Sequence, residues 1–158
     1  MTFRAQMTAA FALIVVVFVV LIAYTIRVAP QMGRESKIAL DAFYQKCRAR
    51  EFEAARSDFT SSLQQSVTPA QFRAEWSNFA AKNGSLSRWE VADKVTINGF
   101  GGSVCVFPPF VDFRHAVFGS KEKGTLIHVR MVPENGQWKV ERFNVLRTGF
   151  DLFRPAKD

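Results

Sequence analysis

The fold is decided by a stretch in the C-terminal third of the chain, LIHVRMVPENGQWKVERFNVL, residues 126–146. Apolar and polar residues alternate on both sides of its centre, which is the pattern of a strand with one buried face. The centre, residues 133–136, reads Pro-Glu-Asn-Gly, and Asn-Gly is a strong signal for a tight hairpin turn. We therefore predict two antiparallel strands, over 126–132 and 137–146, joined by this turn.

Further strand signals precede the hairpin. Residues 89–97 alternate in the same way, and the stretches 103–107 and 110–118 are rich in aromatic and β-branched residues. Pro108 and Pro109 separate the last two stretches, so the chain must be interrupted there or lie at a sheet edge. The second half of the chain is thus predicted to form an antiparallel sheet.

The residues before the predicted sheet follow helical spacing. Apolar residues recur on one helical face over 35–50, and 52–59 predicts a short helix or helical turn that ends in the polar stretch 61–66. Residues 68–71, Thr-Pro-Ala-Gln, supply an N-cap, a first-turn proline and a capping-box glutamine for a third helix, which stops at 83–84, Asn-Gly. Helices followed by antiparallel strands predict an α+β fold, with the helices packed on one face of a curved sheet.

The N-terminal part is far more hydrophobic than the rest. Residues 7–26 contain no charge, and 18 of these 20 residues are apolar. As a helix this run would be about 30 Å long, which matches the hydrocarbon thickness of a bilayer. A cleaved secretory signal would have a shorter apolar core and a small-x-small site, which 27–30 does not offer. We therefore predict a retained single-pass transmembrane helix over 7–27, after an N-terminal tail of 1–6.

The remaining chain divides into a linker over 28–34, one α+β domain over 35–148 and a C-terminal tail over 149–158. Because the linker is short, the domain is expected to stay close to the membrane surface. Three basic residues at the start of this region are candidate contacts with lipid headgroups: Arg27, Arg34 and Lys37. Counted by the positive-inside rule, these residues favour a cytoplasmic domain. The segment nevertheless resembles a signal-anchor, and we expect the domain on the extracytoplasmic, periplasmic side.

Length, charge and cysteine content narrow the function classes. The chain has 158 residues, enough for one ordinary domain, and a net charge of +7 from 21 basic and 14 acidic residues. The basic residues are dispersed among acids with no DNA- or RNA-binding module, so we expect no nucleic-acid partner. Membrane lipid and other membrane protein subunits are the expected partners. Cys47 and Cys105 permit one disulfide or two buried thiols, and the thiols are favoured.

The order of these motifs resembles a known superfamily over residues 36–146. A helix over 39–44, a short helix opening at 51–52, a Thr-Pro-x-Gln-Phe helix and a final Gly-x-Trp-x-Val strand are similar to small domains of the NTF2-like, or cystatin-like, superfamily. The resemblance implies a bent sheet with a long helix in its concavity. The superfamily includes isomerases, dehydratases, transport factors and secretion-system subunits, so it does not by itself imply an activity.

No catalytic, metal or cofactor site is predicted. Asp112 and His115 are the nearest approach to an acid-base pair, but residues three apart in a regular strand point to opposite faces. His128 alternates with apolar neighbours and is expected on the solvated face. Two cysteines and two histidines scattered along the chain do not have metal-ligand spacing. The glycines after residue 98 lack the lysine and following helix of a phosphate-binding loop.

One aromatic stretch is a candidate partner contact, because its prolines can leave backbone groups unpaired and display rings at an edge: Phe107, Pro108, Pro109, Phe110 and Phe113. The alternative is an edge-strand kink with buried rings. The sequence thus predicts a non-enzymatic, membrane-anchored accessory subunit or assembly factor of a larger respiratory, photosynthetic or secretion complex. Two alternatives are a small-ligand or enzymatic NTF2-like pocket, with Asp112 and His115 as candidate acid-base groups, and a module that binds anionic lipid surfaces.

Overall fold

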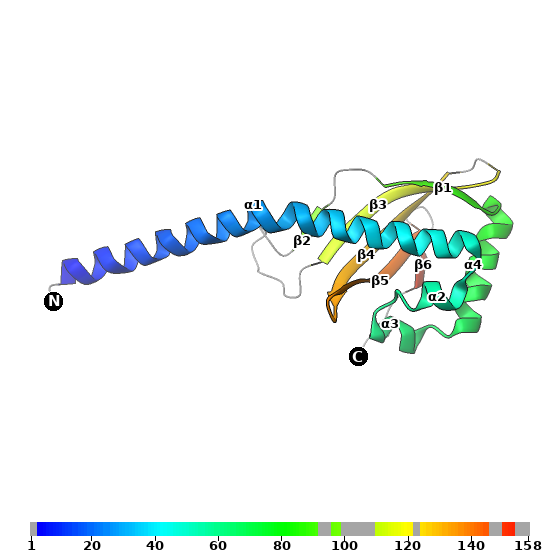
Figure 1. Ribbon diagram of the computed structural model, residues 1–158, viewed down its shortest axis with the longest axis horizontal. Helices are drawn as coiled ribbons and strands as arrows, with labels where there is room; N and C mark the ends of the chain where they lie inside the picture. Colours follow the sequence, from blue (N-terminus) through cyan, green and yellow to red (C-terminus); the bar gives the residue numbers. More distant parts are fainter. Residues whose placement is uncertain (1–2, 92–95, 99–109, 122–123, 146–149, 154–158) are drawn as a thin grey trace. The chain divides into compact units, whose positions relative to one another are not determined.

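The computed structural model describes residues 3–91, 96–98, 110–121, 124–145 and 150–153 (Figure 1). The chain forms two compact units, Met1–Met32 and Gly33–Asp158. One long helix, α1 (Phe3–Ala49), contributes residues to both units. The other helices and the strands all belong to the second unit.

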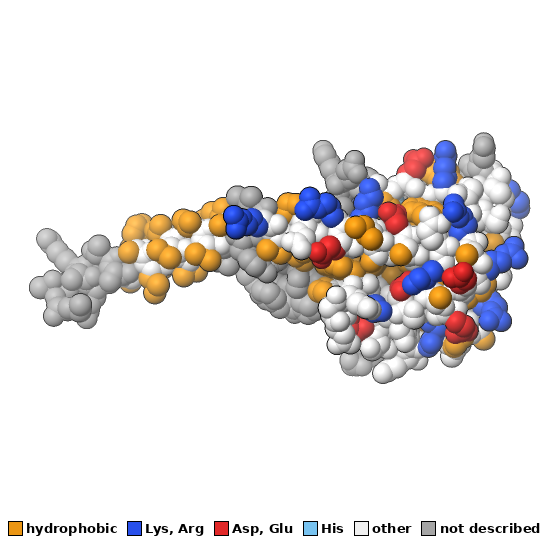
Figure 2. Space-filling view, in the orientation of Figure 1, with side chains coloured by type: hydrophobic (Ala, Val, Ile, Leu, Met, Phe, Trp, Pro, Cys, Tyr) orange, Lys and Arg blue, Asp and Glu red, His pale blue; other side chains and the backbone are white. Residues whose placement is uncertain are grey.

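The first unit is part of an apolar helix whose side chains are open to the surroundings. Its large apolar side chains within 10–22 that the structure describes are 44–69% exposed, and they include Phe11, Leu13, Ile14 and Phe18. Figure 2 shows these hydrophobic side chains covering the helix surface. Among the helices of the described part of the chain, none has a stretch both long and apolar enough to cross a membrane, so the span predicted over 7–27 is not identified there.

The linker predicted over 28–34 does not interrupt the helix, because α1 continues through Pro30 and Gly33. A proline inside a helix removes one backbone hydrogen bond and costs about 3 kcal/mol. Helix propagation is cooperative, and here helical residues lie on both sides of the proline. The residues that we assigned to a linker, 28–34, are therefore helical, although the boundary between the two units falls within them.

Three shorter helices follow α1, namely α2 (Phe52–Arg56), α3 (Ser61–Ser66) and α4 (Pro69–Asn83). The capping box predicted for α4 is confirmed, since Thr68 accepts from the backbone of Gln71 and the Gln71 side chain accepts from the backbone of Thr68. Helix α3 was not predicted, because 61–66 has only one buried apolar residue, Leu63. Its start is fixed by Thr60, whose side chain accepts a hydrogen bond from the Leu63 backbone.

The described strands form one antiparallel sheet. They are β1 (Leu86–Glu90), β2 (Thr96–Asn98), β3 (Phe110–Gly119), β4 (Gly124–Glu134), β5 (Gln137–Val145) and β6 (Phe150–Phe153). The spatial order is β1-β3-β4-β5-β6, and β2 pairs with the same edge of β3 as β1 does. The predicted α+β class and the central hairpin are confirmed. The turn residues Asn135 and Gly136 both have positive φ, as a tight turn of this kind requires.

Two strand predictions need further comment. Strand β6 lies within 149–158, which we assigned to a C-terminal tail, and it pairs with Phe143–Val145 of β5. A four-residue strand has too short a pattern to be recognised from the sequence. The strand predicted over 103–107 lies outside the described residues. The strand predicted over 89–97 is divided between β1 and β2.

The hydrophobic core of the second unit lies between the helices and one face of the sheet. Alternate residues of β3 and β4 are buried on that face, and the C-terminal part of α1 and helix α4 pack against it (Figure 1). The core is dominated by aromatic rings in mutual contact: Phe43, Tyr44, Phe59, Phe72, Trp76 and Phe143. Such rings contribute both apolar area and edge-to-face contacts to stability.

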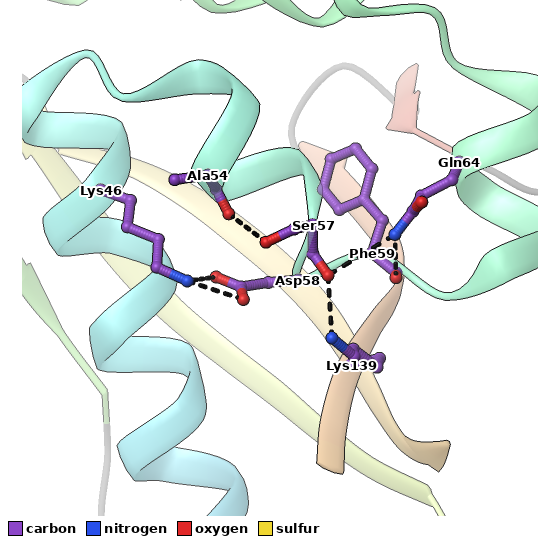
Figure 3. A network of polar contacts seen from close by, with 7 residues as sticks. All are labelled: Lys46, Ala54, Ser57, Asp58, Phe59, Gln64 and Lys139. Atoms are coloured by element: carbon purple, nitrogen blue, oxygen red, sulfur yellow. Dashed lines mark hydrogen bonds and ion pairs between the residues drawn. The ribbon is translucent and has the colours of Figure 1, made fainter. Parts of the chain in front are cut away.

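A polar network ties the loop between α2 and α3 to the rest of the unit (Figure 3). Lys46 of α1 forms an ion pair with Asp58 at 2.7 Å, and Lys139 of β5 donates to the Ser57 carbonyl. Backbone hydrogen bonds join Val140 to both Asp58 and Thr60, so this loop continues the sheet beside β5. These contacts hold the loop between α2 and α3 against α1 and β5, which is a structural role.

Candidate functional site

The face of the sheet opposite the helices carries a cluster of polar side chains on three neighbouring strands. In the register of the sheet, Asp112 lies opposite Arg130, which lies opposite Arg142. The adjacent row contains Arg114, His128 and Asn144 in the same order of strands. A bulge in β5 inserts Glu141, whose carboxylate lies 4.0 Å from Arg130. We call these seven residues the outer-face cluster.

Asp112 is the centre of this cluster. Its carboxylate accepts two hydrogen bonds from the Arg130 guanidinium, at 2.9 and 3.2 Å, and lies 3.0 Å from His128 Nε2. Only 13% of the Asp112 side chain and 14% of the His128 side chain are exposed, so His128 lies on the face away from the core, as expected, but is less solvated than predicted. Burial favours a raised pKa for Asp112, but the hydrogen bonds from His128 and Arg130 and the Arg130 charge outweigh it and lower the pKa to about 2.

Other members of the cluster have unused bonding capacity. Arg142 Nε and Asn144 Oδ1 are buried and have no hydrogen-bond partner among the described residues. The guanidinium group of Arg130 lies over the ring of Phe110 in a cation–π contact, with the guanidinium carbon 4.0 Å from the ring centroid. The cluster thus combines a fixed ion pair with donors and acceptors that remain unsatisfied.

The opposite, helix-covered face contains one buried polar pair. The Tyr44 hydroxyl and His115 Nε2 are hydrogen-bonded at 2.7 Å, and both residues are buried. The rings of Phe43, Trp89 and Phe143 surround Tyr44 at centroid distances of 5.2–6.3 Å. Asp112 and His115, the candidate acid-base groups, therefore lie on opposite faces of β3 and are not brought together.

Burial also sets the protonation of this pair. Burial, with a smaller contribution from the charge of His128, lowers the pKa of His115 to about 4. Burial raises the pKa of Tyr44 well above its usual value, and Cys47 and Asp41 add to this rise. At neutral pH the imidazole is uncharged and the phenol protonated, so neither is tuned for acid-base catalysis near pH 7. The pair satisfies the Tyr44 hydroxyl and His115 Nε2 inside an aromatic core, whereas His115 Nδ1 has no hydrogen-bond partner in the described chain.

The cysteines and the aromatic partner candidates can be placed only in part. Cys47 is a free buried thiol whose pKa is raised by burial, and Cys105 lies outside the described residues. Phe107, Pro108 and Pro109 also lie outside them. Phe110 is half-buried at the start of β3, whereas Phe113 is buried in the core and does not offer a surface contact.

The three lipid-contact candidates all lie on α1. Arg27, in the first unit, and Arg34, in the second, are exposed, and Lys37 is half-buried. A shallow hollow of about 590 Å³ lies at the turn from α1 to α2. In it Arg73 faces Glu53 at 3.8 Å, with both side chains more than 60% exposed. Such a pair is screened by water and indicates no chemistry.

Sequence reasoning missed the outer-face cluster because its members come from three strands, with Asp112, Arg130 and Arg142 lying 12 to 30 positions apart, and they meet only through the strand register. The signal was nevertheless present. Asp112, Arg130 and Arg142 each stand at polar positions of strands that were predicted to be antiparallel. Choosing the register that aligns unlike charges between the first two strands would have brought Asp112 beside Arg130.

No protein-family model, curated protein or solved structure matches this chain.

Proposed function

We propose that the chain is a non-enzymatic, membrane-anchored accessory subunit or assembly factor, whose α+β domain contacts other subunits of a larger membrane complex. The first part of α1 is the anchor, and the domain of NTF2-like type lies on the extracytoplasmic side. Membrane lipid and neighbouring membrane proteins are its partners. A respiratory, photosynthetic or secretion complex fits this role equally.

The observation that carries the proposal is the exposure of the apolar helix surface. Residues 10–20 are eleven consecutive apolar residues, and all of them are exposed. At 100° per residue, eleven residues cover every side of a helix, so no side of this stretch is polar. A helix that is apolar all round requires an apolar environment, which a lipid bilayer supplies.

The aromatic core favours a non-enzymatic accessory role for the protein over catalysis in a pocket. In the NTF2-like superfamily a ligand would bind between the long helix and the sheet. Here this space is filled by packed rings that include Phe43 and Phe143. The two sequence-derived acid-base candidates are separated by the sheet. Neither observation favours turnover of a small molecule.

Membrane extraction tests the anchor. The wild-type chain should remain in the membrane pellet after alkaline carbonate treatment. The variant Val16→Arg/Val19→Arg should move to the supernatant, since each arginine at the centre of a span costs about 2.5–3.5 kcal/mol. Ile38→Arg/Ala42→Arg is the matched control, because it places two arginines on exposed positions of the same helix in the other unit. Equal extraction of both double variants would refute the anchor.

Native size analysis tests the accessory role. After mild detergent solubilisation of native membranes, the chain should migrate in an assembly larger than its own micelle and co-purify with the same membrane proteins in repeated preparations. A stable monomer without companions would contradict the role while leaving the anchor intact.

A further inference from the structure

The dipeptide Asn-Gly stands at two described places in the chain with opposite surroundings. Asn83-Gly84 lies at the end of helix α4, and Asn135-Gly136 forms the turn between β4 and β5 (Figure 1). A third pair, at 98–99, lies partly outside the described residues. Because the two described pairs have the same side chains, the fold around them can give one chemical group two different reactivities.

The groups of the first pair are held by hydrogen bonds. The side-chain nitrogen of Asn83 donates to the Phe79 carbonyl at 3.0 Å, and its side-chain oxygen accepts from the Thr125 hydroxyl at 3.1 Å. The backbone N–H of Gly84 donates to the Ala80 carbonyl at 2.7 Å. Gly84 is also buried, and its neighbours leave no space for a Cβ. This pair cannot rearrange unless the end of α4 opens.

The second pair has none of these restraints. Asn135 and Gly136 are both exposed, and neither the Asn135 side chain nor the Gly136 N–H forms a hydrogen bond with a described residue. The hairpin ladder is closed by Glu134 and Gln137, and beyond the adjacent residues nothing described lies within 4 Å of where a Gly136 Cβ would be. Rotation of the turn residues therefore displaces no other part of the domain, as is typical of exposed loop tips.

We propose that Asn135 is a site of spontaneous deamidation and that the fold protects Asn83 from the same reaction. The Gly136 nitrogen attacks Asn135 Cγ, so that a C–N bond forms, the bond from Cγ to Nδ2 breaks, and ammonia leaves with the proton from the Gly136 N–H. Water then hydrolyses the cyclic imide at either carbonyl and yields aspartate or isoaspartate. Attack within one dipeptide requires only the correct geometry, which a glycine in an open turn can reach.

The two products differ in their effect on the hairpin. Aspartate at 135 adds a negative charge but leaves the main chain of the turn unchanged. Isoaspartate routes the main chain through the side-chain carbon, so the connection between Glu134 and Gln137 gains a methylene and no longer has the geometry of a two-residue turn. Conversion to isoaspartate therefore loosens the end of the hairpin. This reaction involves neither the anchor nor a partner, so it is independent of the accessory role.

Peptide mapping of the full chain in detergent tests the proposal. After incubation at neutral pH, trypsin places Asn135 in the peptide 131–139 and Asn83 in the peptide 83–88, each with a single asparagine. Mass spectrometry measures the mass increase from amide to acid, and chromatography separates aspartate from isoaspartate. Asn135 should convert at least about tenfold faster than Asn83, which must first lose several hydrogen bonds. A smaller ratio, or no conversion of Asn135, would overturn the proposal.

Three controls show whether the fold sets this ratio. A sample digested without incubation gives the background from digestion itself. In denaturant the difference between the two asparagines should largely disappear, and a difference that persisted there would assign it to the neighbouring residues and overturn the protection by the fold. Thr125→Val removes the donor to the Asn83 side chain, and it should speed the conversion of Asn83 several-fold while leaving that of Asn135 unchanged.

Discussion

The two faces of β3, β4 and β5 share one backbone but carry opposite chemistry. On the helix-covered face, apolar residues and packed rings enclose a single uncharged pair, Tyr44 and His115. On the other face, Asp112 and Arg130 form an ion pair within a cluster of charged and polar side chains. The first face is filled by packed apolar side chains, although His115 Nδ1 has no hydrogen-bond partner there in the described chain, whereas the second face consists of charged and polar side chains. The helix-covered face therefore contributes most of the buried apolar contacts of this unit.

The largest effect should come from the aromatic core. Phe43 is fully buried and contacts the rings of Tyr44, Phe59, Phe72 and Phe143. Phe43→Ala should lower the free energy of unfolding by about 3–5 kcal/mol, because it removes buried area and leaves a cavity. Denaturant unfolding of the chain in detergent measures the change.

Leu126→Ala is the matched control for the core substitution. Leu126 is 41% exposed and stands at the same alternation as His128 on β4, away from the helices. Its truncation should cost less than about 1 kcal/mol, since part of its surface already contacts water. If both alanine variants lost similar stability, the contrast between the two faces would be wrong.

The pH dependence of the free energy of unfolding gives a second way to distinguish the two faces. Because the pKa of His115 in the folded chain is about 4, below the unfolded value near 6.5, the unfolded state takes up a proton first as pH falls. Stability should therefore fall by about 3 kcal/mol between pH 6.5 and pH 4. His115→Gln, which cannot titrate, should flatten this part of the stability profile, whereas His128→Gln should retain the fall. A slope unchanged by His115→Gln would show that another group causes it.

Individual turns and helix caps were predicted from the sequence more accurately than the contacts between helices and strands. The hairpin at Asn135-Gly136 and the capping box at Thr68 were predictable because each is encoded by adjacent residues. The helix through Pro30 was not predicted, since a local breaker was given more weight than the cooperativity of the flanking helix. Local signals are reliable where the structure is itself local.

The candidate site shows which contacts could not be predicted from the sequence. That Asp112 and His115 point to opposite faces follows from strand alternation alone. The pairing of Asp112 with Arg130 depends on the register between two strands, and the hydrogen bond of Tyr44 to His115 spans 71 positions from helix to sheet. Such contacts are set by tertiary packing, and no spacing within the sequence encodes them.

The smallest effect tests the outer face itself. Asp112→Asn removes the charge that pairs with Arg130 and His128 but preserves the size of the side chain. It should cost about 1–2 kcal/mol, since a hydrogen-bonded ion pair on a partly buried face is weaker than a filled core. Glu90→Gln is the control, because Glu90 faces Arg88 at 3.7 Å with both side chains over 60% exposed, and it should change stability by less than about 0.5 kcal/mol.

The pH dependence of stability distinguishes the loss of the Asp112 charge from a packing defect in the same variant. The pKa of Asp112 is about 2 in the folded chain and near 3.9 when unfolded, so its contribution is complete above pH 4 and is lost as pH falls from 4 towards 2. This window lies below that of His115. In Asp112→Asn the loss between pH 4 and pH 2 should shrink by about 2 kcal/mol, while the fall between pH 6.5 and pH 4 persists. A variant that kept both slopes would mean that Asp112 is not held as a carboxylate by Arg130 and His128, and the charge balance of the outer face would have to be redrawn.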